Sequence, residues 1–576
     1  MTSLNKAIEH RRIVLVVLIV LVAAAVLLRV PMLLYGMPFD LGDEDENGFI
    51  GCALNYGATM SLKPILTWYP AFHTYVLAAA FGVYFLFGLV TGAVSGATDF
   101  AVSYLMYPGK FHFVGRLVSM LFTAAGIVLI YHCGKRYQGR LTGLLASGLL
   151  ALSSMALVRT SWALPDSTYL LLTILSIYFV LCYGDSRRLR HAVAAGLCCG
   201  LAVATKYNVG TLLVVGICGI ALTHWELTGT MRLPARLMSM LRVRAFYAYG
   251  VAVVLGFIIG TPYFVFDIPL HLAGLQWEIG RLGAEASGSS NFFSRLPYLW
   301  IFSELVVWER GMGILVIVGL LVSIGRLVRG ERIHWMFLPY LLVTVVLIGR
   351  YDKHSLHYMF PAFPALFLAA AAGLSRLFQA HRYAAALMAI GVTAALISST
   401  PKLLSLSSFY TQTDTRLAAS NWIQSNLPSR AVIAIGRTIH APPLQDADRF
   451  SKPAYSMIGE QIMSRRLPKT IKRAYSEKIS GNAYRLTHYI VRQSGGRTAS
   501  YAEMMSDFAV LPMDRLTAPS PDFVIYSSAD RGYLLRGGYS DFLDIPGFNK
   551  SLRLEKNFAP TGNGLVGPRI AIYSVQ

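Results

Sequence analysis

This sequence has few charged residues and no internal repeat. Each of these absences excludes some classes of protein. Only 14% of its 576 residues are charged, 55% are hydrophobic, and the mean hydropathy is +0.51. Soluble domains do not reach that hydropathy, and apolar runs of about 18–24 residues recur along the chain, as in proteins with several transmembrane helices. No half of the chain repeats the other, although such a repeat is common among transporters.

Cysteine is scarce and confined to the first part of the chain. The six cysteines all lie at or before Cys218, five of them in or beside apolar runs, and their spacing matches no CxxC metal site. The sequence therefore predicts neither a disulfide framework nor a cysteine-based metal centre.

Acidic residues are also few. The chain has 30 Asp and Glu residues but 51 Lys and Arg residues, which gives a net charge of +21. The basic residues form small clusters beside apolar runs, which is the pattern of membrane topology signals and not of a nucleic-acid partner. Lys6, Arg11 and Arg12 precede the first apolar run, which no cleavage site follows, so we expect a retained first span with a cytoplasmic N-terminus.

The apolar runs predict about 11 full spans. They lie at about 13–35, 113–132, 141–158, 165–183, 190–205, 208–224, 245–262, 311–328, 334–349, 356–376 and 382–399. Basic turns place 135–140, 187–190, 232–244, 326–332 and 376–382 in the cytoplasm. For the alternation to hold, the apolar region 65–94 must cross an even number of times, so we expect a re-entrant or interfacial segment or a tight hairpin there.

The remaining turns then lie outside, together with the acidic stretch 43–46 and everything after residue 400. From about 401 the apolar runs shorten, a helical pattern starts at Asp414, and strand-like runs follow at 431–435, 523–526 and 569–573. The predicted fold is a polytopic α-helical membrane domain of about 11–13 spans, residues 1–400 with a first extracytoplasmic loop 36–112, followed by a soluble extracytoplasmic α/β domain, residues 401–576.

Four consecutive acids, Asp43 to Glu46, are the first chemical signal. A carboxylate beside the low-dielectric membrane can act as a general base, whereas the ordinary interpretation is a solvated charged loop. Lys206 lies between two apolar runs and either snorkels to the surface or binds a lipid phosphate.

Two more outside turns carry charge. Asp166 follows Pro165 and is either a carboxylate at a helix N-terminus or a site residue. Arg350, His354 and His357 share one turn, which indicates either contact with lipid headgroups or a phosphate clamp.

Taken in order, these patterns resemble the GT-C glycosyltransferases, in particular the phospholipid-carrier-dependent group related to protein O-mannosyltransferases (glycosyltransferase family 39) and lipid A aminoarabinose transferases. The matching patterns are Asp43-Glu44, Tyr69-Pro70 with Tyr75, Arg116, Lys135-Arg136, Arg159 with Asp166, Gly200 to Lys206-Tyr207, His357-Tyr358 with Pro361 and Pro364, and Asp414 to Trp422. These patterns extend over most of the chain. Their order along the sequence and their predicted position on one side of the membrane make the combination more specific than any single pattern.

The resemblance implies a donor whose sugar is carried on polyprenyl phosphate, and a site outside the membrane. Asp43 would be the general base with Glu44 beside it, and Asp166 would position a substrate; if a divalent metal is used, Asp43, Glu44 and Asp166 would bind it. The departing phosphate and the sugar would be held by Lys206, Tyr207, Arg350, His354, His357, Tyr358, Arg159, Arg116 and Tyr69.

The sequence departs from the family pattern at two places. Trp162 stands where many relatives have His, and Leu62-Lys63-Pro64 lacks the Glu of the aminoarabinose transferases, so a zinc site and that substrate are not supported. The acceptor implied is a cell-envelope glycan, a lipid or a protein. Compact loops and the lack of extracytoplasmic cysteine pairs favour a bacterial inner membrane, with the site and the C-terminal domain facing the periplasm.

Other classes of function stay open from the sequence. A multispan transporter or flippase for lipid-linked sugars would also carry charges near membrane spans. A non-catalytic glycan-binding membrane protein could keep the fold and lose the reaction, and a hydrolase could use water as the acceptor.

Overall fold

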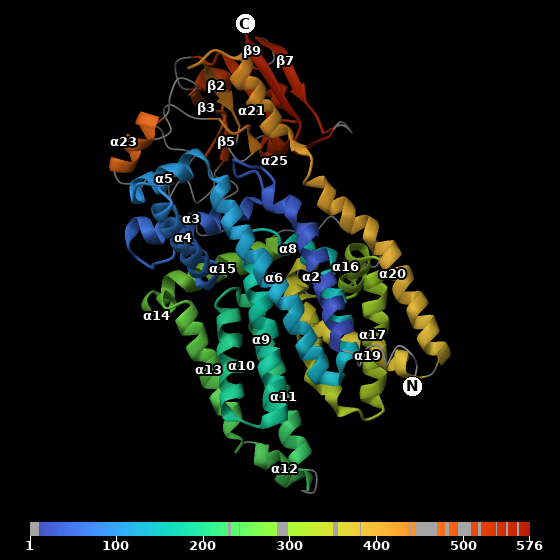
Figure 1. Cartoon of the computed structure of the whole chain (residues 1–576). Helices are drawn as coiled ribbons and strands as arrows, with labels where there is room; N and C mark the ends of the chain where they lie inside the picture. Colours follow the sequence, from blue (N-terminus) through green and yellow to red (C-terminus); the bar gives the residue numbers. More distant parts are fainter. Residues whose placement is uncertain are drawn as a thin grey trace. The chain divides into compact units, whose positions relative to one another are not determined.

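A computed structural model shows how the chain folds, and its helices and strands are labelled in Figure 1. It describes residues 11–228, 232–240, 242–284, 298–349, 355–380, 382–436, 440–444, 469–478, 483–492, 508–516, 520–536, 538–548, 551–560 and 564–576. The chain divides into two compact units: residues 1–30, 67–73 and 117–407 form the first, and residues 31–66, 74–116 and 408–576 form the second. The first loop, which the sequence analysis grouped with the membrane domain, is thus mostly in the second unit.

The first unit is helical throughout its described residues. Its longer helices are α2 (Arg11–Leu34), α6 (Gly109–Gln138), α7 (Arg140–Ala151), α9 (Pro165–Ser186), α10 (Leu189–Val203), α11 (Leu213–Leu227), α13 (Arg244–Gly260), α15 (Ile268–Ala284), α16 (Trp300–Glu309), α17 (Gly311–Val328), α18 (Leu338–Ile348), α19 (Phe363–Ala380) and α20 (Arg382–Phe409). Shorter elements are α8 (Ser154–Arg159), α12 (Leu233–Met240), α14 (Tyr263–Phe266) and the 3-10 helices η1 (Tyr207–Leu212), η3 (Arg332–Met336) and η4 (Leu356–Ala362). The helices α2, α6 and α20 continue into the second unit.

The predicted spans coincide with helices. Among the described residues, eight helices are long and apolar enough to cross a membrane, and four shorter apolar segments, Arg140–Ala151, Leu189–Val203, Arg244–Gly260 and Arg332–Ile348, complete the set. Each of the eleven predicted spans falls on one of these twelve, and the chain is a multi-pass membrane protein. The twelfth is α4 (Phe72–Val90), a single uninterrupted helix, so of the three alternatives predicted for 65–94 the tight hairpin is wrong.

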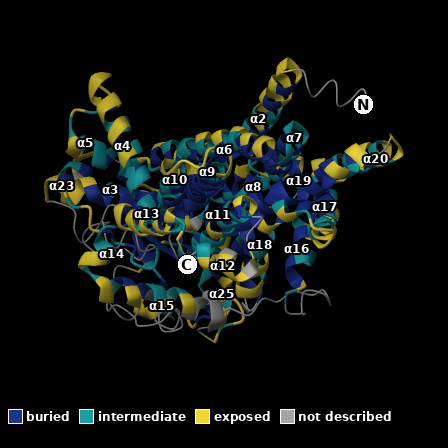
Figure 2. Ribbon diagram, turned by 90° about the horizontal axis from the view of Figure 1, so that it is seen from below, coloured by how far each residue is buried: buried dark blue, intermediate teal, exposed yellow. Residues whose placement is uncertain are grey.

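Helix packing in the first unit follows small residues and burial. Gly196 and Gly200, one turn apart on α10, face α13 so closely that a Cβ on Gly200 would lie 2.1 Å from the carbonyl oxygen of Val253. This small-xxx-small spacing lets two apolar helices pack backbone to backbone in a membrane. Residues 358–375 are all buried, whereas α2 and α20 are largely exposed on the periphery, as Figure 2 shows.

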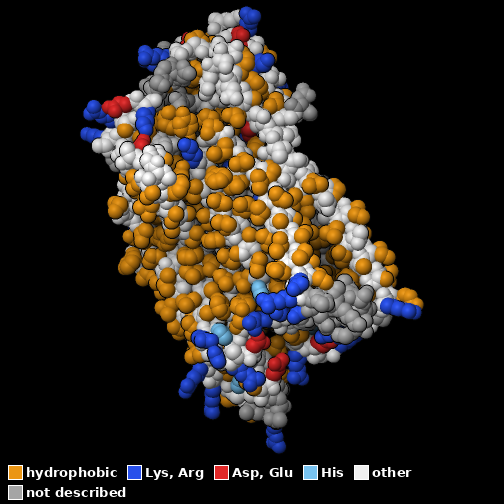
Figure 3. Space-filling model, viewed as in Figure 1, with side chains coloured by type: hydrophobic (Ala, Val, Ile, Leu, Met, Phe, Trp, Pro, Cys, Tyr) orange, Lys and Arg blue, Asp and Glu red, His pale blue; other side chains and the backbone are white. Residues whose placement is uncertain are grey.

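The basic turns predicted to share one side do lie at the same end of the first unit. Arg136 pairs with Asp185, Tyr137 donates to the carbonyl oxygen of Ile333, and Arg376 approaches Glu331. Figure 3 shows hydrophobic side chains over the sides of these helices, with Lys and Arg gathered at the end near α12.

The second unit combines the first loop with the C-terminal domain. The first loop contributes α3 (Glu44–Thr59), most of α4, and α5 (Ala97–Met106). The C-terminal domain has a five-stranded sheet in the order β3 (Arg485–His488), β2 (Val432–Ile435), β6 (Phe523–Ser527), β9 (Ile570–Val575) and β7 (Leu552–Phe558). The strands β3, β2 and β6 are parallel, and β9 runs antiparallel to both β6 and β7.

The C-terminal domain is the α/β fold that the sequence predicts. The helix predicted from Asp414 is α21 (Thr415–Asn426), and the Asp414 side chain accepts a hydrogen bond from the Arg416 amide as its N-cap. The predicted strands are β2, β6 and β9. The domain has two further α-helices, α23 (Lys469–Lys478) and α25 (Arg531–Arg536). It also has two short strand pairs, β1 (Thr413–Asp414) with β8 (Leu565–Val566) and β4 (Ile490–Arg492) with β5 (Phe508–Val510).

Candidate active site

The acidic stretch begins a helix. Asp43 is the N-cap of α3, and its carboxylate accepts a hydrogen bond from the Asp45 amide at 3.0 Å. The side chain of Asp43 is half-buried, whereas that of Asp45 is exposed. Of Glu44, only the backbone at the start of α3 is described. An N-cap carboxylate is favoured in its charged form, because helix amides and the dipole stabilise negative charge.

The last acid of the stretch has a different role. Glu46 is fully buried and accepts hydrogen bonds from Nε and Nη2 of Arg116, the shortest at 2.7 Å. Arg116 also donates through Nη1 to the carbonyl oxygens of Met32 and Tyr35. Arg116, expected at the substrate, is thus buried in an ion pair that joins α6 to α3 and to the end of α2.

The C-terminal domain fixes the segment that leads to Asp43. Asp414 accepts a hydrogen bond from Tyr35 Oη at 2.6 Å, and Arg416 donates from Nη2 to the carbonyl oxygen of Leu41 at 2.9 Å. Burial raises the pKa of Tyr410, and the negative charge of the nearby Asp43 carboxylate raises it further. Tyr410 is therefore a neighbour of the acidic stretch. The start of the C-terminal domain therefore positions the chain on the N-terminal side of the candidate base.

The first unit contains a second charged cluster, centred on Asp166. This carboxylate is fully buried at the start of α9, just after Pro165 at the first helical position. It accepts hydrogen bonds from Arg159 Nη2 at 3.0 Å and from Tyr169 Oη at 2.7 Å, and Lys206 Nζ lies 4.0 Å from its Oδ1.

Lys206 turns inward. Its side chain is about 10% exposed, and Nζ lies 5.9 Å from the ring centre of Tyr69 and 5.8 Å from that of Tyr169. Such cation–π contacts stabilise an ammonium group away from water. The cluster of Arg159, Asp166 and Lys206 places two cations and one carboxylate beside aromatic rings. That combination suits a phosphate with an apolar tail.

Buried contacts hold the turn that carries Arg159. The fully buried Glu309 accepts hydrogen bonds from the Ser153 hydroxyl and from the amides of Ser154 and Met155, which are the first residues of α8. At the other end of α8, the buried Arg29 donates from Nη2 to Oγ1 of Thr160 at 3.1 Å. The carboxylate lies at the positive end and the guanidinium at the negative end of α8, as the helix dipole favours.

His73 supports the start of α9 from α4. Its Nδ1 lies 2.9 Å from Thr168 Oγ1, and its Nε2 lies 3.2 Å from the carbonyl oxygen of Ala163. The sequence analysis did not select Glu309, Arg29 or His73. For Arg29 a signal was present, because an arginine within an apolar span is costly unless it has a buried partner.

The residues described after the ninth predicted span, from Ser355 onward, also lie at this end of the first unit. The Asn208 side chain donates to the carbonyl oxygen of Tyr358 at 3.4 Å, so η1 and η4 are neighbours. Tyr207 is half-buried with no hydrogen-bond partner for its hydroxyl among the described residues. His357 bonds Ser355 at 2.6 Å and its ring lies against Tyr358. Arg350 and His354 lie outside the described residues.

The structure thus brings Arg159, Asp166, Lys206 and Tyr69 together, while Asp43 belongs to the second unit. Within the described parts of the chain there is no group of three or more His, Cys, Asp or Glu side chains that could hold a metal ion. Asp43 and Asp166 belong to different units, and a metal held by Asp43, Glu44 and Asp166 stays a prediction.

Comparisons with known proteins agree with this fold. Residues 101–241 match the sequence profile of the dolichyl-phosphate-mannose-protein mannosyltransferase family, and the match includes Arg159, Asp166 and Lys206. No curated protein sequence matches the chain.

Solved structures show the same architecture. The Archaeoglobus fulgidus oligosaccharyltransferase tethered with an acceptor peptide is 13% identical, with a TM-score of 0.51 over 98% of this chain and 74% of that one. ArnT from Cupriavidus metallidurans, bound to undecaprenyl phosphate, is 15% identical, with a TM-score of 0.46 over 96% of this chain and 97% of that one. The resemblance to GT-C glycosyltransferases is confirmed, and the chain has that fold.

Proposed function

We propose that this multi-pass membrane protein with the GT-C fold is a glycosyltransferase that moves a sugar from a polyprenyl-phosphate carrier to an extracytoplasmic acceptor. The observation that carries the proposal is the cluster of Arg159, Asp166 and Lys206, which holds two cations on one buried carboxylate, with Lys206 beside Tyr69 and Tyr169. The family profile that covers this cluster is named for a donor of the same class, a sugar on a lipid phosphate.

Lys206 and Arg159 are proposed to bind the donor phosphate. When the bond between the sugar C1 and the phosphate oxygen breaks, the electron pair stays on that oxygen, and the added negative charge is stabilised by cations already in place. Asp166 would hold both cations in position, because its carboxylate contacts both. Tyr207, His357 and Tyr358, at the same end of the unit, are proposed to contact the donor.

Asp43 is proposed as the general base. Its carboxylate would take the proton of an acceptor hydroxyl while the hydroxyl oxygen forms the new bond to C1. The support is its place in the family pattern and its half-buried position at the start of α3. Asp43 belongs to the second unit, whereas the residues proposed to bind the phosphate belong to the first, so each role is supported by contacts within its own unit.

The substrates are proposed only as classes. The donor would carry a hexose or a pentose, and the acceptor would be a cell-envelope glycan, a lipid or a protein. We place the protein in a bacterial inner membrane with the C-terminal domain in the periplasm, because the basic turns lie together at one end of the first unit.

Native mass spectrometry with undecaprenyl phosphate as the probe tests the donor site. Delipidated wild-type protein should bind one equivalent, and Lys206→Met should weaken binding roughly 10- to 100-fold. A charge-assisted hydrogen bond contributes about 1.5–3 kcal/mol, which corresponds to that range. Arg159 still pairs with Asp166 in the variant, so the cluster should stay folded.

The matched control is Lys135→Met, an exposed lysine at the basic end of the same unit. It loses the same charge and should bind the probe like the wild type. Equal affinity of all three proteins would remove Lys206 from the phosphate site. Failure of the wild type to bind the probe would favour a transporter of another substrate or a non-catalytic protein.

A further inference from the structure

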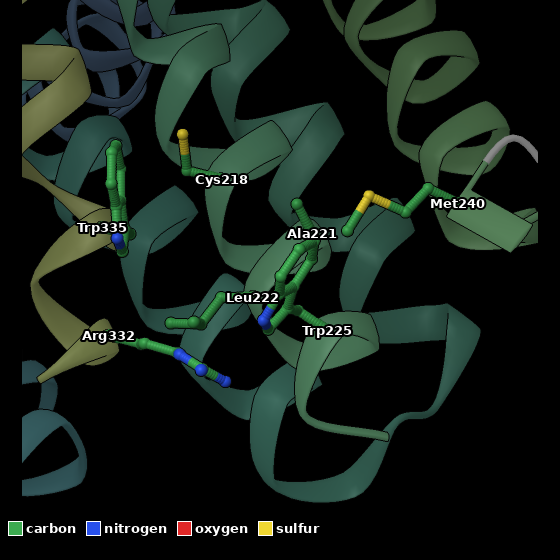
Figure 4. Close-up of a pocket in the computed structure, with 7 residues that line it drawn as sticks. All are labelled: Cys218, Ala221, Leu222, Trp225, Met240, Arg332 and Trp335. Carbon is green, nitrogen blue, oxygen red and sulfur yellow. The ribbon is translucent and has the colours of Figure 1, made fainter. Parts of the chain in front are cut away.

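A cavity of about 340 Å³ lies at the basic end of the first unit, between α11, α12 and η3. Its walls are formed by apolar side chains, among them Leu222, Trp225, Met240 and Trp335, and by one charged residue, Arg332 (Figure 4). Volumes of about 300–1,000 Å³ are usual for small-molecule sites. An apolar wall with a single guanidinium suits a ligand that is apolar over most of its length and negatively charged at one end.

Within the described parts of the chain, no neighbouring side chain neutralises the charge of Arg332. Two other arginines near η3, Arg326 and Arg376, approach the same carboxylate, that of Glu331. Among the described residues, no carboxylate lies within ion-pair distance of Arg332, and its side chain is exposed. The local ion pairs therefore leave this arginine available to an anion.

The cavity is placed where a membrane lipid could enter. Trp335 is 53% exposed, and Ile217 and Leu227 on α11 are each 49% exposed, as expected for helix surfaces that contact lipid. Tryptophan favours the level of the lipid headgroups, and basic pockets between spans on the cytoplasmic side bind anionic headgroups. Figure 4 shows Trp225 and Trp335 on different elements, with Arg332 extending from η3 toward α11.

We infer that this cavity binds an anionic glycerophospholipid, with its phosphate on Arg332 and an acyl chain along Leu222, Trp225 and Met240. This site is separate from the donor cluster, because Lys206 precedes η1 and the N-terminal end of α11, whereas the residues of α11 that line the cavity, from Cys218 to Trp225, lie toward its C-terminal end. The inference does not depend on the proposed glycosyl transfer. The bound lipid would come from the membrane leaflet at the basic end of the first unit.

The test is native mass spectrometry of the full-length, delipidated protein titrated with phosphatidylglycerol and with phosphatidylcholine of the same chain length. The wild type should prefer phosphatidylglycerol, and Arg332→Gln should lower that affinity about 10-fold while leaving phosphatidylcholine unchanged. Arg329→Gln is the matched control, since it removes an exposed charge three residues away that does not line the cavity. It should bind like the wild type.

A second variant tests the cavity itself. Ala221→Leu adds volume at a lining position and should weaken phosphatidylglycerol without any change of charge. The inference is overturned if Arg332→Gln binds phosphatidylglycerol as tightly as the wild type, or if Arg329→Gln loses as much affinity. It is also overturned if the Arg332 variant loses bound undecaprenyl phosphate and keeps phosphatidylglycerol, because the carrier would then occupy the cavity.

Discussion

Neighbouring acids in the first loop have very different surroundings. Asp43 caps α3, Asp45 is exposed, and Glu46 is buried against Arg116. A general base needs access to a substrate and must be free to take a proton, which excludes Glu46 while Arg116 holds it. Asp43 is only half-buried at the start of α3, so a substrate can reach it more easily than the fully buried Glu46, and it fits the role better.

The base assignment predicts a sharp difference between Asp43→Asn and Asp45→Asn. Asparagine caps a helix as well as aspartate does, so α3 should persist in the first variant. General-base catalysis typically contributes 10²–10⁴-fold, so transfer from a labelled polyprenyl-phosphate sugar in membranes should fall by about 100-fold or more. Asp45→Asn removes an equal charge two residues away and should retain activity within about 2-fold.

Thermal unfolding of both variants separates catalysis from folding. Unchanged melting temperatures together with lost activity in Asp43→Asn alone would support the base. Full activity in that variant would instead assign the reaction to another group.

At the residue scale, the sequence indicated the charged groups but not their supports. Asp166 and Lys206 could be selected because a charge beside an apolar run needs a partner. Glu309 could not, since its partners are a hydroxyl and two backbone amides about 155 residues earlier in the chain. Contacts of that kind depend on tertiary packing, which leaves no local pattern.

At the scale of elements, α23 packs on α5 through a small hydrophobic cluster and an ion pair. Ile471 and Tyr475, one turn apart on α23, pack on Val102 and Leu105 of α5. Lys478 of α23 also pairs with Asp99 of α5, and this hydrogen bond lowers the pKa of the Asp99 carboxyl.

We predict that α23 binds α5 less firmly at acid pH. A lowered pKa in the folded state means that the ion pair stabilises the contact above the usual aspartate pKa of about 3.9, and that this stabilisation is lost as the pH falls below it. The pair is partly exposed, so its contribution should be at most about 1 kcal/mol. Hydrogen exchange of a peptide covering 469–478 should accelerate slightly in Lys478→Gln.

The control for this contact is Glu477→Gln. It breaks the pair between Arg473 and Glu477 within α23 and leaves the link to α5 intact. If both variants exchanged alike at neutral pH and below pH 4, the pair with Asp99 would have no role in holding α23.

Two features that the sequence missed have different physical reasons. The predicted span 141–158 is split into α7 and α8, because Ser153 caps a new helix and Glu309 binds its first amides. The strand β7 is at the edge of its sheet and largely exposed, with charged side chains and an irregular register near Leu554, so its hydrophobic pattern is weak. Buried strands such as β2 were predictable because their apolar runs are continuous.

For the whole molecule, the chain passes repeatedly between two compact units, so neither unit is a continuous segment. The prediction of a domain boundary near residue 400 rested on a change of composition, and residues 408–576 belong to the second unit together with 31–66 and 74–116. The first loop gave no such signal. Its assignment to the second unit follows from contacts such as that of Arg416 with Leu41, which join residues far apart in sequence.

The membrane orientation is the last prediction, and labelling of introduced cysteines tests it. Positively charged turns remain in the cytoplasm during insertion, so the basic end of the first unit should face inward and the C-terminal domain outward. Arg329→Cys lies in an exposed basic turn, and Ser425→Cys lies on the exposed side of α21. An impermeant maleimide added to spheroplasts should label Ser425→Cys at once and Arg329→Cys only after the membrane is opened.

The native cysteines should add little background, because four of the six are buried and the other two only partly accessible. The wild-type protein, treated in the same way, measures that background directly. The reverse labelling order would place the charged cluster around Asp166 on the cytoplasmic side. A polyprenyl-phosphate donor in the periplasmic leaflet could then not be its ligand.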